Sequence, residues 1–196
     1  MTVKQIVQSA AALLQADDIE ELFAAWQDPP DGETTEGAPP ADPAQDADVK
    51  TLVKSVNLAA AELCANGFPV CRQERANAAD GIIPFTELTC VPSLVRGVQR
   101  NNVSVSFTAD DRGIIVPADG EYTVLYIVQT TDKTLDEELE TGAGVDINIL
   151  TYLAARNYCL ITGRTDDAHI WDQRYCAETE NKRMARRARV RGRAWR

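Results

Sequence analysis

The sequence predicts an α+β protein, in which a helical bundle carries an inserted small antiparallel β-meander and ends in an extended C-terminal arm. Three observations support this fold class. Apolar residues recur at helical spacing near both ends of the chain. Between residues 69 and 129 they follow a period of about two instead. The last fifteen residues hold eight of the twenty basic residues and no acid, so twelve bases face thirty acids in residues 1–181.

Residues 1–27 are expected to form two short N-terminal helices. The first is predicted at Val3–Leu14, where apolar side chains repeat at helical spacing. Asp17 or Asp18 then offers an N-cap for a second helix that runs to about Trp26. We expect its apolar face to close over the first helix.

The segment at 28–48 differs from the rest of the chain, because it is rich in proline and acids and contains no base. Such a segment cannot bury a core, so it is predicted to be an acidic, Pro-rich loop or arm. Two interpretations stay open: the arm reaches a neighbouring subunit, or it has no role.

A third helix is predicted from Asp46 or Asp48 to Asn66. Its apolar residues are spread widely around the helix, so we expect it to lie centrally. After it, Gly, Pro, Asn and Asp separate short runs rich in Val, Ile and Phe, as in a β-meander with local pairings. The predicted strands are at 69–73, 81–85, 90–99, 103–107, 113–116 and 121–129, and turns are predicted at 100–102, 110–113 and 118–120.

A helical hairpin is predicted at 145–181. Its first helix spans residues 145–162 and stops at Gly163, and a second helix starts at Thr165. Trp171 and Tyr175 are one turn apart, so they share a face and should pack against the preceding helix.

The sequence predicts no catalytic residue, no metal site and no cofactor. His169 is the single histidine, which excludes a histidine cluster, and the acids beside it are explained by the helix dipole. The five cysteines form no C-x-x-C pair and are expected to be reduced and mostly buried: Cys64, Cys71, Cys90, Cys159 and Cys176. No stretch has the roughly 20 apolar residues of a membrane span, and no signal peptide is recognisable, so we expect a protein made in a cytoplasm.

Three stretches carry a resemblance to a protein family: residues 52–69, residues 120–126 and above all residues 158–175. In the last, Gly163 is followed by an acidic first turn and then by Trp171, Asp172, Arg174 and Tyr175. This pattern resembles phage and prophage head-to-tail adaptor (connector) proteins over about residues 50–180. It is a packing pattern and includes no chemically reactive residue.

The resemblance implies a non-enzymatic structural subunit with an adaptor core at 49–181. Such subunits form a homo-oligomeric ring, which here would have twelve members. The ring would lie in the virion neck after assembly in the host cytoplasm. Its partners would be the portal protein, downstream tail or neck proteins, and DNA that passes through the channel without specific binding. No membrane partner is implied.

The basic C-terminal tail, residues 182–196, has three open interpretations. It can dock on an acidic portal or subunit surface, it can contact DNA, or it can be a disordered end. The second makes a nucleic-acid-binding protein the alternative function. We expect a helix to about Arg187 and an extended chain beyond it. The candidate partner-binding residues are Lys182, Arg183, Arg186, Arg187, Arg189, Arg191, Arg193, Trp195 and Arg196.

Overall fold

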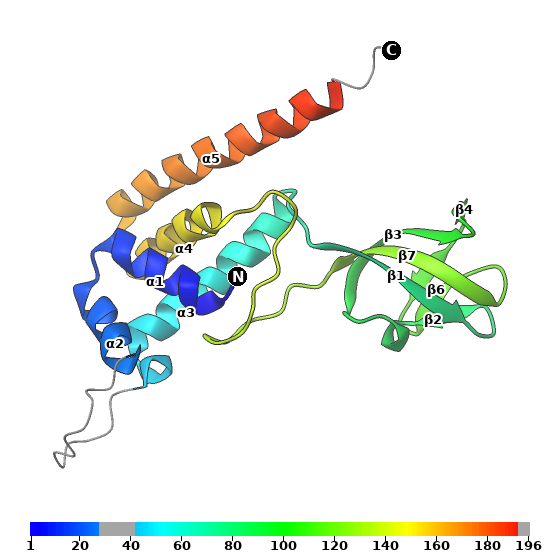
Figure 1. Ribbon diagram of the computed structural model, residues 1–196, viewed down its shortest axis with the longest axis horizontal. Coiled ribbons are helices and arrows are strands. Elements are labelled where there is room, and N and C mark those ends of the chain that lie inside the picture. The colour runs from blue at the N-terminus through cyan, green and yellow to red at the C-terminus, as the bar shows by residue number, and fades with distance from the viewer. Residues whose placement is uncertain (28–41, 192–196) are drawn as a thin grey trace. The chain divides into compact units, whose positions relative to one another are not determined.

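Helices and antiparallel sheets both occur in this chain, as the α+β prediction requires. The computed structural model describes residues 1–27 and 42–191 and divides the chain into two units. A helical unit comprises residues 1–63 and 132–196, and a β unit comprises residues 64–131 (Figure 1). The helices are α1 (Val3–Leu14), α2 (Asp17–Gln27), α3 (Ala47–Ala65), α4 (Ile147–Ile161) and α5 (Thr165–Arg191), with a short 3-10 helix η1 (Pro43–Gln45).

The core of the helical unit is built on α4. Nine of its fifteen residues are buried, against six of nineteen in α3, so α4 is more deeply buried than the helix expected to lie centrally. Helix α1 packs on both α4 and α2. The largest fully buried side chains of this core include Ile6, Leu52, Ile149, Leu150 and Leu153.

The start of α1 is fixed by local hydrogen bonds. The side chain of Thr2 accepts a hydrogen bond from the backbone of Gln5, and the Gln5 side chain accepts one from the backbone of Thr2. This reciprocal capping box satisfies two backbone donors that the first helical turn leaves unpaired. The backbone of Val3 also donates to the carbonyl of Glu137, which ties the N-terminus to the segment before α4.

The β unit contains two antiparallel sheets around one core. The four-stranded sheet has the order β1 (Cys71–Ala78), β7 (Gly120–Val128), β3 (Pro92–Arg100) and β4 (Val103–Val105). The three-stranded sheet has the order β2 (Ile82–Pro84), β6 (Gly113–Ile115) and β5 (Thr108–Asp110), and a 3-10 helix η2 (Phe85–Glu87) follows β2. The buried side chains shared by the two sheets include Ile83, Ile114, Tyr122, Val124 and Tyr126.

The expectation that every strand pairing is local is wrong. Strand β7 lies between β3 and β1, and the pairing of Cys71 with Ile127 joins residues more than fifty positions apart. The alternating pattern identifies which face of a strand is buried, but it carries no information on the partner strand. Strand β1 also extends to Ala78, beyond its predicted end at 73, and β5 was not predicted, because only its last residue, Asp110, had been assigned, to a turn.

The cysteines differ from the expectation of mostly buried thiols. Cys159 is buried, Cys64 and Cys90 are half-buried, and Cys71 and Cys176 are exposed. Burial raises the pKa of the Cys159 thiol above its ordinary value, which keeps this group protonated. Among the described helices, none combines the length and apolar character needed to cross a membrane.

Candidate functional site: the α4–α5 hairpin and the basic end of α5

The hairpin turn is formed by Gly163. Its φ of +79° lies in the left-handed region, which glycine adopts without strain. The backbone of Arg164 donates to the carbonyl of Cys159 at 2.7 Å, so the last turn of α4 is closed by a hydrogen bond from beyond it. The Arg164 guanidinium then pairs with Asp167 in the first turn of α5.

Aromatic side chains join the two helices. Trp171 of α5 stacks on Tyr152 of α4, with ring centroids 6.1 Å apart and planes inclined by 15°. The guanidinium of Arg174 lies over the ring of Trp171, 4.9 Å from its centroid. Tyr175, one turn after Trp171, is buried. Of the three residues named for hairpin packing, Gly163 therefore lies in the turn, Trp171 lies at the contact with α4, and Tyr175 is buried.

Arg156 connects three helices. Its guanidinium extends from α4 to Glu62 on α3 and to Asp172 on α5, the latter at 3.1 Å. It also donates to the side-chain carbonyl of Asn157, whose amide donates in turn to the backbone of Ser55. Only 17% of the Arg156 side chain is exposed, against 31% for Glu62 and 41% for Asp172, so these ion pairs are partly shielded from water and are screened less than fully exposed pairs are.

Lys182 fixes α5 to the start of α4. Its ammonium group lies 2.7 Å from the carboxylate of Asp146 and 3.9 Å from that of Glu178. Asp146 is the N-cap of α4, because its side chain accepts a hydrogen bond from the backbone of Ile149. Lys182 was expected to bind a partner, which stays a prediction, and in the structure it also has an intramolecular role.

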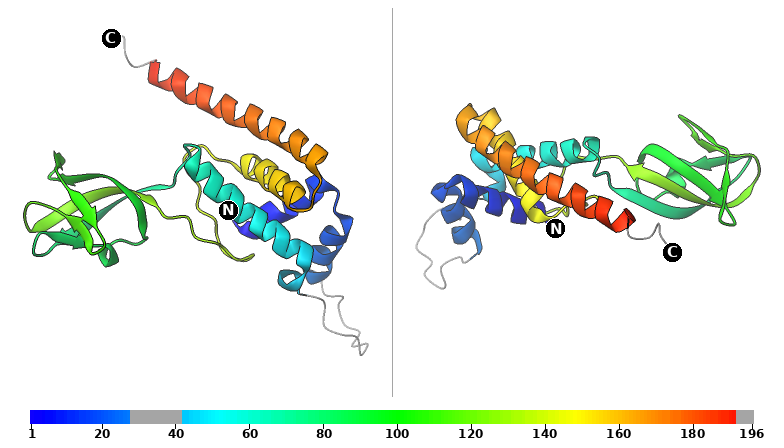
Figure 2. Two further views of the ribbon diagram at one scale, coloured as in Figure 1. Left: turned by 180° about the vertical axis from the view of Figure 1, so that it is seen from behind. Right: turned by 90° about the horizontal axis from the view of Figure 1, so that it is seen from above.

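Beyond Lys182, helix α5 continues past the start of α4 (Figures 1 and 2). Residues 183–191 add about 14 Å of helix at 1.5 Å per residue. This overhang, as we call residues 183–191, contains five arginines and no acid: Arg183, Arg186, Arg187, Arg189 and Arg191. The predicted site residues Arg193, Trp195 and Arg196 lie outside the described residues.

The overhang corrects the prediction that the chain is extended beyond Arg187, because the backbone is helical to Arg191. Arginine and alanine both favour helices, and they make up most of this stretch. Positive charge near a helix C-terminus also interacts favourably with the helix dipole. The alternation of arginine with small residues, which suggested a strand, is therefore compatible with a helix.

The acids near His169 do not gather around it. Within the described residues, no three potential ligands among His, Cys, Asp and Glu come together as a metal site. His169 contacts Gln173 one turn later, and Asp172 is engaged by Arg156.

Sequence reasoning missed Arg156 and Asp146 as the polar contacts that hold the hairpin. An arginine inside an otherwise uncharged helix is a usable signal, because a buried guanidinium must be paired. The identity of its partners was not accessible, since Glu62 and Asp172 lie far from it in the sequence.

We expect the contact between Asp146 and Lys182 to make the stability of the helical unit depend on pH. Burial acts to raise the pKa of Asp146, but hydrogen bonds from Lys182 and the Ile149 backbone lower it below the ordinary 3.8. The charged carboxylate of Asp146 therefore stabilises the folded state at pH values above 3.8, and this stabilisation is lost as the pH falls through the lowered pKa of the folded state. The free energy of unfolding of Asp146→Asn should approach that of the unchanged protein in this acidic range.

Asparagine is also a good N-cap, so this variant isolates the charge. Urea denaturation followed by tryptophan fluorescence measures the helical unit, because Trp26, Trp171 and Trp195 all belong to it. Glu180→Gln, an exposed change on α5, is the matched control. A difference between Asp146→Asn and the unchanged protein that is constant from pH 7 to pH 3 would contradict this role of the charge.

The chain matches no known protein-family model and none of the curated proteins.

Proposed function

We propose that this chain is a structural head-to-tail adaptor subunit of a phage particle, located in the neck between the capsid portal and the tail. In this proposal, a helical bundle with an inserted β element assembles as a ring. The ring docks on the portal, extends the DNA channel and offers a platform to tail proteins. The motif around Gly163 and Trp171, which resembles that family, supports the proposal.

The observation that carries the proposal is the division of α5 into an anchored and an overhanging part. Up to Lys182 the helix is held on α4 by stacking, burial and ion pairs. The overhang continues the same helix with five arginines and no acid. A rigid support followed by a charged end suits docking, because little additional order must be imposed on binding.

Charge favours an acidic protein partner for the overhang. Residues 1–181 carry thirty acids against twelve bases, so most of the chain repels phosphate. Arginine forms two parallel hydrogen bonds with a carboxylate as it does with a phosphate, so the repulsion of phosphate by the rest of the chain decides between the two partners. An acidic portal surface therefore fits the overhang better than nucleic acid, which remains the alternative partner because it requires only positive charge.

The five arginines provide a test that separates these partners. Changing all five to lysine keeps the charge and removes the arginine geometry. We expect this variant to bind the portal about tenfold more weakly, which corresponds to roughly 1.4 kcal/mol, while any binding to duplex DNA is retained. Changing all five to glutamine should weaken both.

Portal capture and DNA affinity would be measured at one salt concentration, because ionic strength alters both. The control is Lys4, Lys50 and Lys54 changed to glutamine, which removes positive charge elsewhere on the helical unit. Portal capture that survives the glutamine change would exclude the overhang as the docking element. Tight DNA binding by the unchanged chain, with no portal capture, would favour the alternative function.

A further inference from the structure

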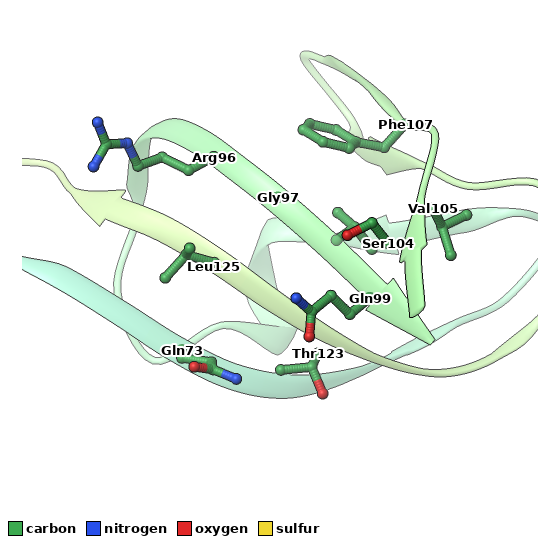
Figure 3. Close-up of a pocket in the computed structure, with 10 residues that line it drawn as sticks. Gln73, Arg96, Gly97, Gln99, Ser104, Val105, Phe107, Thr123 and Leu125 are labelled. Atoms are coloured by element: carbon green, nitrogen blue, oxygen red, sulfur yellow. The ribbon is translucent and has the colours of Figure 1, made fainter. Parts of the chain in front are cut away.

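The β unit has a groove on the outer face of its four-stranded sheet. It encloses about 230 Å³ and is lined by residues of β1, β3, β4 and β7 and of the loop after β4. Arg96 and Phe107 lie at opposite ends, with Gly97 between them (Figure 3). The rest of the lining is formed by three apolar residues, Val98, Val105 and Leu125, and by four polar ones, Gln73, Gln99, Ser104 and Thr123.

Gly97 creates the hollow. It pairs with Leu125 of β7 at an irregularity in the register, and a Cβ built on it would meet no atom within 4 Å. The residues beside Gly97 across β7 and β1, Leu125 and Gln73, carry side chains on this face, so the absence of a side chain at Gly97 leaves a hollow next to them. A glycine inside a strand often marks a place where another chain approaches closely.

Arg96 gives the groove a positive charge. Four of the five arginines of the β unit are held by other groups: Arg72 by Glu74, Arg75 by Glu121, Arg112 by Asp110 and Arg100 by the carbonyl of Asp119. Arg96 is exposed and has no hydrogen bond or ion pair to another described residue. A groove with a guanidinium at one end, an aromatic ring at the other and amide side chains in its lining suits a peptide that carries a carboxylate.

The size of the groove also favours a peptide. Its volume is below the roughly 300–1,000 Å³ of typical small-molecule sites. It is sufficient for one or two side chains of an extended segment. Pro-rich segments bind on grooves that present aromatic side chains, as Phe107 does here, because proline loses little conformational freedom on binding.

We propose that the groove binds the acidic, Pro-rich segment 28–41 of a second copy of this chain. That segment contains four acids, four prolines and no base, so its charge complements Arg96. The arginine-rich C-terminal end would be repelled there. The inference rests on the proposed function in one respect, because the contact would join neighbouring subunits of the ring.

The length of the segment agrees with this occupant. Helix α2 and η1, which precede and follow it, contact each other, so only a few residues are needed to connect them. Fourteen residues separate Gln27 from Asp42. If half of these residues lead away from the helical unit and half lead back, the segment can reach at most about 24 Å from its two ends. That distance is enough to contact an adjacent subunit.

The test uses the full chain with residues 28–41 replaced by a Gly-Ser segment of equal length, so that its own segment does not compete. A fluorescent peptide of residues 27–42 is titrated with this protein, and binding is followed by anisotropy. We expect a dissociation constant on the order of 0.1 mM, as for a short peptide without the effective concentration of a ring. The control peptides are the same sequence with its acids changed to amides, and residues 183–196.

Two substitutions in the groove locate the binding site. Gly97→Val fills the hollow and should weaken binding at least about tenfold. Arg96→Gln removes the charge of an exposed residue and should weaken binding about fivefold. Arg112→Gln, whose guanidinium is paired with Asp110 outside the groove, should leave the affinity unchanged.

The inference is overturned by no binding up to about 1 mM, by equal binding to all variants, or by a preference for the basic peptide. Circular dichroism of Gly97→Val checks that the fold is kept, and Arg96→Gln provides an independent test. These outcomes are separate from the portal measurement, which changes only α5. Peptide binding without portal capture would contradict the adaptor function and support the groove as a binding site. Portal capture without peptide binding would support the adaptor function and contradict the groove as a binding site.

Discussion

Replacing Arg156 with alanine is expected to lower the free energy of unfolding of the helical unit by about 3 kcal/mol. The guanidinium joins α4 to Glu62 of α3 and to Asp172 of α5, and it holds the side chain of Asn157. Alanine leaves these groups without their donor. The loss is large because Arg156 is mostly buried, whereas surface ion pairs contribute at most about 1 kcal/mol.

Urea denaturation followed by tryptophan fluorescence measures this effect, since the β unit contains no tryptophan. Arg156→Lys keeps the charge but cannot bridge both carboxylates with a planar group, so an intermediate loss of about 1–2 kcal/mol is expected. Arg164→Ala removes the more exposed pair with Asp167 and should cost less than about 1 kcal/mol. Equal losses for Arg156→Ala and Arg164→Ala would show that Arg156 does not connect the three helices energetically.

Gly113→Ala is expected to destabilise the β unit by about 2–3 kcal/mol. Gly113 lies in β6 between Pro84 of β2 and Asp110 of β5. A Cβ at this position would come within 2.3 Å of the carbonyl oxygen of Ile83 and 3.0 Å of the Cα of Pro84. Both atoms belong to the backbone, so the strands must move apart to admit the methyl group.

Gly97→Ala is the matched control, because its Cβ would meet nothing within 4 Å. Amide hydrogen exchange of β6 and of its partner strands reports on the β unit alone. When the whole β unit unfolds more readily, the amides of all these strands lose protection together. We expect fast exchange across the three-stranded sheet in Gly113→Ala and unchanged exchange in Gly97→Ala. Protection that is unaffected in Gly113→Ala would mean that the strands adapt to the methyl group at no cost.

Local patterns in the sequence were sufficient to predict where the helices lie, except for the end of α5. Val3–Leu14 begins and ends where predicted, because apolar spacing determines its buried face and Thr2 supplies the cap. The turn at Gly163 was equally accessible, since a left-handed residue favours glycine. In both places the determinants lie within a few residues of the element they set.

Features that depend on residues distant in the sequence were not predicted. The pairing of β1 with β7 brings Ala78 opposite Gly120, and alternation within each strand does not specify such a partner. The contacts of Arg156 and the intramolecular role of Lys182 are of the same kind. The groove at Gly97 is formed by side chains of four neighbouring strands, so it could not be predicted without knowing the order of the strands.

The helical end of α5 was mispredicted for another reason. Alternating arginine and small residues fit a strand as well as a helix, and the deciding influence is the helix already established from Thr165 onward. Extending an existing helix adds one hydrogen bond for each residue that becomes fixed, whereas starting a new element is costly. The overhang on which the proposed docking depends is therefore a consequence of the anchored hairpin.

Imaging of intact particles that carry this chain with a small electron-dense or fluorescent label tests the adaptor function most directly. For an adaptor subunit we expect label in a ring directly below the portal vertex, with the C-terminal end of α5 toward the portal. Label distributed over the capsid shell, at the tail tip, or on packaged DNA would contradict it.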